Sequence, residues 1–275
     1  MKAGRAVRRW LRWAGERWRP LVPQSWRAWR SICTDDQGRR VPARIRPLVP
    51  CTICGGTRFR HCPKPRLLSF SGRLGWCANC QSLERHRAFR KILTAVGRKQ
   101  FGRARCLQFS GDKSIRPSWF GQFELSIYGK ENSLDIQQIA RADASYDVII
   151  CNHVVEHVPA HRKALRELGR ILSDRGFLFL SVPDPARRTQ TEDWGQPDPM
   201  RNHHYREFGP DFADLLKQEL PDLSIVEVRA SDDVTGDPDI AYILTRNAAW
   251  YRRALATPFR SRVHATRPFA PNSTH

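Results

Sequence analysis

Short apolar runs alternate with segments of helical periodicity from about residue 104 onward. This alternation is typical of strand–helix–strand units and predicts a mainly parallel sheet with helices packed on it. The predicted strands cover residues 106–110, 123–128, 146–151 and 176–182, and the predicted helices cover residues 160–172 and 211–220. Two last strands, at 223–228 and 240–244, are joined by Asp-rich turns, which indicates a closing antiparallel hairpin. The fold class is therefore α/β, with one domain over residues 104–246.

The basic charge of the chain is unevenly distributed along its length. The formal net charge is +20, but residues 106–245 contain 15 basic and 23 acidic side chains. The excess lies in residues 1–50, with 13 basic and 3 acidic side chains, and in residues 51–105, with 13 and 1. A net positive charge attracts nucleic acids, whereas an acidic domain does not suit a phosphate-rich acceptor. Nucleic acid is therefore the less expected partner.

Residues 1–31 form a basic, Trp-rich segment with an amphipathic pattern. At about 100° per residue, one side of a helix receives Trp10, Leu11 and Trp18, and arginines occupy the opposite side. This composition is typical of a helix that lies in a membrane interface, so residues 1–30 are expected to bind an anionic membrane surface. The alternatives are docking of the Trp face on the protein's own core, a nucleic-acid arm and a transit-like segment.

Two further segments are expected to lack a packed structure. Residues 32–50, rich in proline and arginine, are predicted to be a linker, and residues 247–275 a basic, flexible tail. No apolar run approaches the roughly 18 residues that span a membrane, and the N-terminus lacks the apolar stretch of a secretory signal. The expected location is cytoplasmic, with peripheral attachment to the inner face of the membrane.

Four cysteines form two CxxC pairs, Cys51 with Cys54 and Cys77 with Cys80, separated by 22 residues. Two such knuckles can present four thiolates to Zn²⁺ in tetrahedral geometry. His61 and Cys62 lie between the pairs as substitute ligands, and reduced cysteines without metal are the alternative. We predict a zinc-ribbon-like module over residues 51–81 with a structural Zn²⁺, followed by a connecting helix over residues 82–103.

Three stretches of the α/β domain carry a resemblance to a known family. They read YDVIICNHVVEHVP over residues 146–159, ALRELGRIL over 164–172 and GFLFLSVP over 176–183. Together they resemble the fourth strand, the following helix and the fifth strand of class I S-adenosylmethionine (SAM)-dependent methyltransferases, in the bacterial form with an HVLEHV motif. The Cys-rich module followed by SLERHR resembles the zinc-binding N-terminal extension of some members. The resemblance implies a Rossmann-like methyltransferase fold and SAM as the methyl donor.

The first motif departs from the family pattern. Members usually carry a glycine-rich loop of the form ExGxGxG after strand one, whereas this chain has Ser110-Gly111-Asp112 with one glycine. The family also places an acid near the end of strand two for the ribose hydroxyls, and Glu131 corresponds to it only loosely. Asp135 fits the family's acidic residue near the adenine better. By resemblance, the cofactor-binding residues are Phe109, Ser110, Gly111, Glu131, Asp135 and Asn152.

The sequence His153-Val-Val-Glu156-His157 matches the H-x-x-E-H pattern of inverted zinc proteases. That reading needs both histidines on one helix, with the glutamate as general base. Here the motif directly follows an apolar strand, and ligands of open α/β sheets lie beyond the carboxyl ends of strands. We therefore expect His153 to face the methyl donor or acceptor as a general base. Alternatively, the histidines only hydrogen-bond loops together.

The segment after the fifth strand is polar and broken by prolines. It resembles the "TyED…dHvRxYgxDf" loop of the same methyltransferases, and a solvated loop is the alternative. Functional residues concentrate in such loops, so Asp193, His203 and His204 join His153 as candidate catalytic residues, and Trp194 and Tyr205 could stack on a ring. The predicted function is methyl transfer to a hydroxyl of a small molecule or glycan. The alternative is a non-catalytic SAM-fold protein, tethered to a membrane or nucleic acid by its N-terminus.

Overall fold

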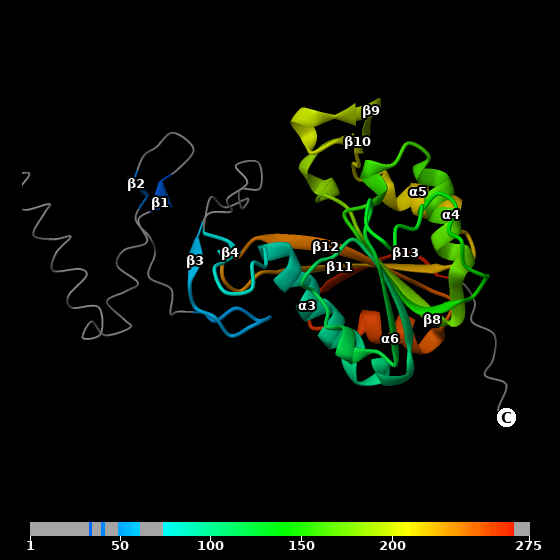
Figure 1. Ribbon diagram of the computed structural model, residues 1–275, viewed down its shortest axis with the longest axis horizontal. Coiled ribbons are helices and arrows are strands. Elements are labelled where there is room, and N and C mark those ends of the chain that lie inside the picture. Colours follow the sequence, from blue (N-terminus) through cyan, green and yellow to red (C-terminus); the bar gives the residue numbers. More distant parts are fainter. Residues whose placement is uncertain (1–32, 35–39, 42–48, 61–73, 267–275) are drawn as a thin grey trace, which may run out of the picture.

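The computed structural model describes residues 33–34, 40–41, 49–60 and 74–266 (Figure 1). Its centre is a seven-stranded sheet in the order β13-β11-β12-β8-β7-β5-β6. The strands are β5 (Arg105–Phe109), β6 (Gln122–Ser126), β7 (Tyr146–Asn152), β8 (Leu172–Ser181), β11 (Ser224–Ser231), β12 (Pro238–Thr245) and β13 (Arg260–Ala265). Strands β6, β5, β7 and β8 run parallel, whereas β12 is antiparallel to both β8 and β11. The predicted α/β class and closing hairpin are confirmed.

Helices cover both faces of this sheet, as Figure 1 shows. Successive residues of a strand point to opposite faces, so the apolar centre of β7 contributes Ile149 to one core and Val148 and Ile150 to the other. Helices α4 (His161–Ile171) and α5 (Phe212–Glu219) pack on the first core. Helices α3 (Glu84–Gly97) and α6 (Ala248–Leu255) pack on the second. Strands buried on both faces explain the continuous apolar runs in the sequence.

Two predictions about segment boundaries are wrong. The flexible tail predicted over residues 247–275 is instead structured up to residue 265. Helix α6 covers the sheet, and β13 pairs antiparallel with β11. The residues of β13 are largely exposed and polar, so the strand carries no apolar pattern to reveal it. The predicted connecting helix is also part of the domain, because the fully buried Phe89, Ile92 and Leu93 of α3 belong to its core.

The remaining elements are short. Two-residue strands form the pairs β1 (Cys33–Thr34) with β2 (Arg40–Val41), inside the predicted linker, and β3 (Phe59–Arg60) with β4 (Trp76–Cys77). A hairpin of β9 (Glu192–Asp198) and β10 (His204–Glu207) projects beyond the sheet (Figure 1). The 3-10 turns are η2 (Arg98–Arg103), η3 (Pro117–Trp119), η4 (Val155–His157), η5 (Pro185–Arg187) and η6 (Pro199–Arg201).

No helix within the described residues is both long enough and apolar enough to cross a membrane. The predicted amphipathic helix over residues 1–31 lies outside the described residues. Most of the predicted linker, residues 32–50, is also outside them. Residues 267–275 lie outside them as well. The predictions for these segments therefore stay predictions.

Candidate functional site

The carboxyl ends of the parallel strands meet at one edge of the sheet, where open α/β proteins bind ligands. Asn152, the last residue of β7, is buried and donates from Nδ2 to Asp112 Oδ2 at 2.7 Å. Its Oδ1 accepts a hydrogen bond from Ser181 Oγ, the last residue of β8, at 3.1 Å. Asp112 also accepts a hydrogen bond from the Ser114 amide. The polar groups that follow β5, β7 and β8 thus form one network.

The backbone at this edge has unusual conformations. Ser110 follows β5 with a φ of +62°, and His153 follows β7 with a φ of +53°. Their amides donate to the carbonyls of Ser126 and Ser181, at 2.9 Å each, which ties each turn to the neighbouring strand. Between β5 and β6 the structure has only η3. The helix N-terminus that often receives anionic groups in such folds is therefore replaced by a short irregular loop.

The predicted cofactor residues lie at different places on this edge. Ser110 and Gly111 directly precede Asp112 in the chain, and Asn152 donates a hydrogen bond to it. Phe109 is 3% exposed and its side chain belongs to the core, so it can offer little beyond its backbone. Glu131 and Asp135 are exposed in the segment after β6. Asp135 Oδ1 accepts hydrogen bonds from the amide and side chain of Gln137, which fixes this turn.

Histidines and a buried glutamate gather next to the Asn152 network. Glu156, His157 and His204 each place a nitrogen or oxygen atom within 4.8 Å of those of the other two. His153 Nδ1 lies 3.5 Å from Glu156 Oε1. Burial lowers the pKa of His153 well below its usual value, lowers that of His204 to about 4 and raises that of Glu156. Burial therefore keeps His153 neutral at pH 7.

The β9–β10 hairpin brings His204 to this cluster. Arg206 of β10 donates to the carbonyls of Val158 and Pro159, immediately after η4, and its Nε donates to Asp193 Oδ2 at 2.7 Å. Asp193 is thus held in an ion pair with Arg206. Burial by itself raises the pKa of Asp193, but the hydrogen bonds from Arg206 and the Gly195 amide, together with the charge of Arg206, lower it. This candidate catalytic residue therefore has a partner that opposes its protonation.

The other aromatic and imidazole candidates of this loop are placed differently. His203 is exposed at the turn of the hairpin with a φ of +61°, outside the cluster around Glu156. Trp194 Nε1 donates to the His204 carbonyl at 2.8 Å, and the Arg201 guanidinium lies 4.7 Å from the centre of the Trp194 ring. Trp194 therefore supports the backbone of His204, which the sequence did not indicate.

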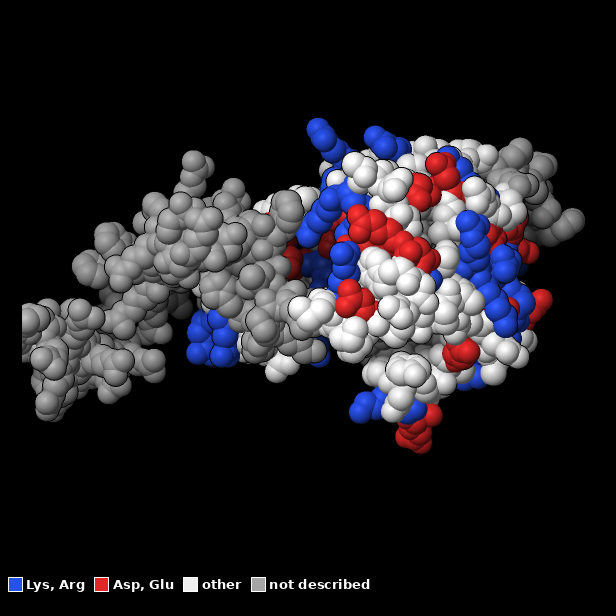
Figure 2. Space-filling model, turned by 90° about the horizontal axis from the view of Figure 1, so that it is seen from above, with Lys and Arg blue, Asp and Glu red and all other residues white. Residues whose placement is uncertain are grey.

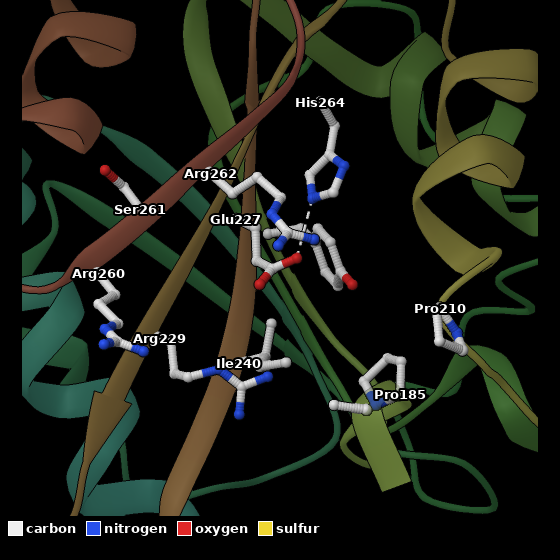
Figure 3. A pocket seen from close by; sticks show the side chains of 11 residues that line it. Pro185, Pro210, Glu227, Arg229, Ile240, Arg260, Ser261, Arg262 and His264 are labelled. Carbon is white, nitrogen blue, oxygen red and sulfur yellow. Dashed lines mark hydrogen bonds and ion pairs between the residues drawn. The ribbon is translucent and has the colours of Figure 1, made fainter. Parts of the chain in front are cut away.

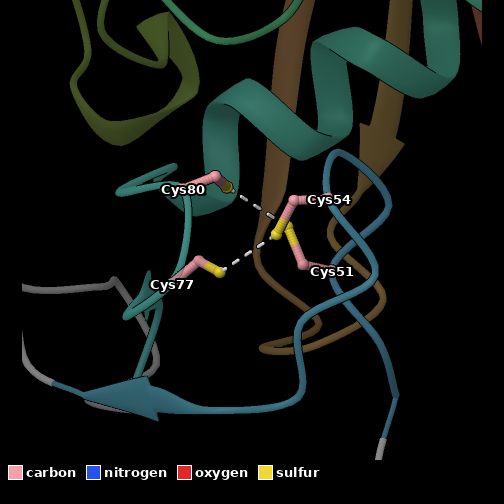
Figure 4. Close-up of side chains that lie close together, drawn as sticks. All are labelled: Cys51, Cys54, Cys77 and Cys80. Atoms are coloured by element: carbon pink, nitrogen blue, oxygen red, sulfur yellow. Dashed lines mark hydrogen bonds between the residues drawn. The ribbon is translucent and has the colours of Figure 1, made fainter.

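The four cysteines of the two knuckles converge (Figure 4). The Sγ–Sγ distances are 3.8 Å for Cys51 and Cys80 and 3.6 Å for Cys54 and Cys77. Four thiolates bound tetrahedrally at about 2.3 Å from Zn²⁺ lie about 3.8 Å apart, so the donor set fits this ion. Ser82 Oγ, 3.2 Å from Cys80 Sγ, adds a polar contact. His61 and Cys62, the substitute ligands, lie outside the described residues.

A cavity of about 480 Å³ lies on the antiparallel side of the sheet (Figure 3). Its walls include Arg229 from β11, Tyr242 from β12, and Arg260 and Arg262 from β13. Inside it, His264 Nε2 and Glu227 Oε2 are 2.9 Å apart. The sequence does not reveal this cavity, because the polar residues of β13 show no strand pattern. The cavity shares no lining residue with the predicted site.

Comparison with known proteins identifies the family. The profile of a family described as a methyltransferase domain matches residues 64–219, more than half of the chain. The chain belongs to this methyltransferase family. No curated protein matches it.

Solved structures similar to this methyltransferase chain have low sequence identity to it. One is the Burkholderia thailandensis 1,6-didemethyltoxoflavin-N1-methyltransferase with bound S-adenosylhomocysteine, with 15% identity, a TM-score of 0.40, and coverage of 57% of this chain and 77% of that chain. Another is a possible histamine N-methyltransferase from Thermotoga maritima, with 13% identity, a TM-score of 0.37, and coverage of 58% and 91%.

Proposed function

We propose that the protein binds SAM at the carboxyl ends of β5, β6 and β7 and transfers its methyl group to a hydroxyl of a small molecule or glycan. The observation that carries this proposal is the network of Asn152, Asp112 and Ser181, in a chain of the methyltransferase family. These polar groups occupy the edge at which α/β sheets bind ligands. Asp135 and the Ser110-Gly111 turn border the same edge and are the proposed contacts to the adenosine and methionine parts.

In this reaction the acceptor oxygen is itself the nucleophile, so the protein must supply a base rather than a nucleophile. When bound, SAM would supply a methyl group on a positively charged sulfur, and the electron pair of the C–S bond would stay on the sulfur as the methyl carbon bonds to the acceptor oxygen. The acceptor hydroxyl must lose its proton as the bond forms, and a neutral imidazole is suited to take it. We assign this role to His153, which follows Asn152 at the end of β7 and has a left-handed backbone. His203 and His204 remain the alternative bases.

The charge of the domain supports a neutral or cationic acceptor over a nucleic acid. Figure 2 shows acidic and basic side chains intermingled over the domain face in that view. A surface that binds a phosphate backbone gathers basic side chains on one stripe. The acidic excess over residues 106–245 points the same way.

Titration calorimetry of the full-length protein with SAM and with S-adenosylhomocysteine tests the proposal. We expect saturable binding, and we expect Asn152→Ala and Asp135→Ala to weaken it by about 5- to 100-fold, since a lost or unpaired polar contact costs about 1–3 kcal/mol. Gln100→Ala replaces an exposed side chain of η2, before β5, and is the control, which should bind normally. Absence of binding at millimolar SAM in folded protein would overturn the proposal. Binding without turnover on any hydroxyl acceptor would favour the tethered, non-catalytic alternative.

We also propose that Cys51, Cys54, Cys77 and Cys80 hold one structural Zn²⁺. Burial raises the pKa of Cys77 to about 12. Burial also acts to raise the pKa of Cys54, but hydrogen bonds, among them those from Asn79 and Gly56, lower it to about 7. A bound cation would keep both as thiolates. Cys77→Ser should lose one equivalent of zinc and the order of the module, while the sheet domain stays folded by circular dichroism. Unchanged zinc content in the variant would contradict the assignment.

A further inference from the structure

A second group of metal-ligating atoms lies away from the four cysteines, where η4 meets β10. It consists of the Glu156 carboxylate and the imidazoles of His157 and His204, whose ligand atoms lie within 4.8 Å of one another. The rings of His157 and His204 meet edge to face, with centroids 4.6 Å apart. Two elements distant in sequence thus converge their side chains on one point.

The buried position of Glu156 and its missing hydrogen bonds indicate that its carboxylate binds a ligand. Its side chain is 0% exposed, and neither carboxylate oxygen has a hydrogen-bond partner among the described residues. His204 is 8% exposed and its Nδ1 is likewise without one. Although His153 Nδ1 lies 3.5 Å from Glu156 Oε1, a buried carboxylate without a hydrogen bond is costly, and a coordinated cation removes that cost. We propose that Glu156, His157 and His204 bind a divalent transition-metal ion of the zinc class.

The donor set favours this class of ion over Mg²⁺ or Ca²⁺. Two imidazole nitrogens and one carboxylate oxygen suit Zn²⁺ and neighbouring first-row ions, whereas Mg²⁺ and Ca²⁺ prefer oxygen ligands throughout. Three protein ligands leave a position open, as in catalytic rather than structural zinc sites. The exposed His157 leaves that position accessible to a ligand from solvent.

Hydrogen bonds from side chains to backbone carbonyls hold the two halves of the site together. Arg206 donates to the carbonyls of Val158 and Pro159 and so fixes β10 against the turn after η4. Trp194 donates to the His204 carbonyl from the other strand of the hairpin. These contacts position His204 independently of any metal, and metal sites depend on such supporting contacts.

The site adjoins His153, which gives the metal a role that rests on the proposed function. A hydroxyl oxygen bound at the open position of a zinc-class ion has a lowered pKa. The metal would therefore bind and acidify the acceptor hydroxyl, which narrows the acceptor class to molecules whose oxygen can coordinate a metal. His153 Nδ1 lies 3.5 Å from Glu156 Oε1, so the proposed base and the metal group are neighbours.

The test counts metal ions in the full-length protein after equilibration with Zn²⁺ at micromolar free concentration. Elemental analysis should give one equivalent more for the wild-type protein than for His204→Ala or His157→Ala. His203→Ala replaces the adjacent, exposed histidine outside the group and is the matched control, with wild-type content expected. The difference of one equivalent does not depend on how much zinc the cysteines hold.

Two further readouts separate the possible failures. Circular dichroism establishes folding, and if His204→Ala unfolds, His157→Ala carries the test because its side chain is exposed. Equal metal content in the folded variants and the wild type would overturn the metal site. SAM affinity is measured on the same samples, so a protein that binds SAM without the extra ion contradicts this inference alone. A protein that binds the ion without SAM contradicts only the proposed function.

Discussion

Single residues at the carboxyl edge hold strained conformations. A left-handed backbone costs a residue other than glycine about 1–2 kcal/mol, and Ser110 and His153 both adopt it. Such strain persists where neighbouring contacts enforce it and concentrates at functional sites. Hydrogen bonds to the adjacent strands enforce it here, and these follow from the sheet rather than from local sequence. This is why the residue types alone predicted the place of His153 and not its conformation.

Asp239, at the start of β12, gives a prediction about pH. Burial raises its pKa to about 7, although its Oδ1 accepts a hydrogen bond from the Ile240 amide. Between about pH 4 and pH 7 the folded state therefore binds more protons than the unfolded state, so this carboxyl lowers stability as the pH rises. Asp239→Asn should increase the free energy of unfolding at pH 8, by at most about 4 kcal/mol, and have little effect at pH 4.

Urea denaturation at the two pH values measures this difference. Asp174→Asn is the control, because that carboxylate is 92% exposed. An Asp239→Asn variant with the same stability difference at pH 4 and pH 8 would show that the carboxyl is ionised in the folded protein throughout this range.

At the level of elements, the sequence predicted what local patterns determine. Helix α4 and strands β7 and β8 were predicted correctly because their apolar residues follow the helical period or form continuous runs. The β9–β10 hairpin and β13 were missed because their residues are polar and their pairing depends on distant partners. For the same reason, the sequence indicates His153 and His204 as candidates but not that His204 lies beside Glu156. Arg206 docks the hairpin on the turn after η4 and so brings His204 to Glu156.

A buried ion pair joins α3 to the β11–β12 turn beside the cysteine module. Arg87 of α3 donates from Nε and Nη2 to the two oxygens of Asp232, in the β11–β12 turn, at 2.7 Å each, and both side chains are 0% exposed. Arg87 also donates to the Ser82 carbonyl, next to the second knuckle. Asp232→Ala should therefore lower the free energy of unfolding by about 3–5 kcal/mol, since it leaves a buried guanidinium without its partner.

A double-mutant cycle measured by urea denaturation checks this. The paired replacement Arg87→Met with Asp232→Leu removes both charges and should be less destabilising than Asp232→Ala alone. Additive effects of the two sites would indicate that the pair contributes no coupling between α3 and the β11–β12 turn.

For the whole molecule, charge is divided between an acidic domain and a basic N-terminal part. The sheet domain, with its acidic excess, contains the proposed SAM edge and the metal group, whereas the basic excess lies towards the N-terminus. A small acceptor needs no basic surface on the domain. The N-terminal charge is therefore available for a partner other than the acceptor. The five tryptophans within residues 1–30 favour a membrane surface as that partner.

We propose that residues 1–30, which lie outside the described residues, bind anionic membrane surfaces. This segment has 9 basic residues, one acid and five tryptophans. Each basic residue near an anionic surface contributes on the order of 1 kcal/mol, and burial of the Trp face adds to this attraction. Full-length protein should sediment with phosphatidylserine-containing vesicles, less so as the salt concentration rises, and not with neutral vesicles. A truncated chain that begins at Ser31 should stay in the supernatant. Because self-docking would bury the same tryptophans without responding to lipid, full-length protein that stays in the supernatant at low salt would assign them to the protein's own core.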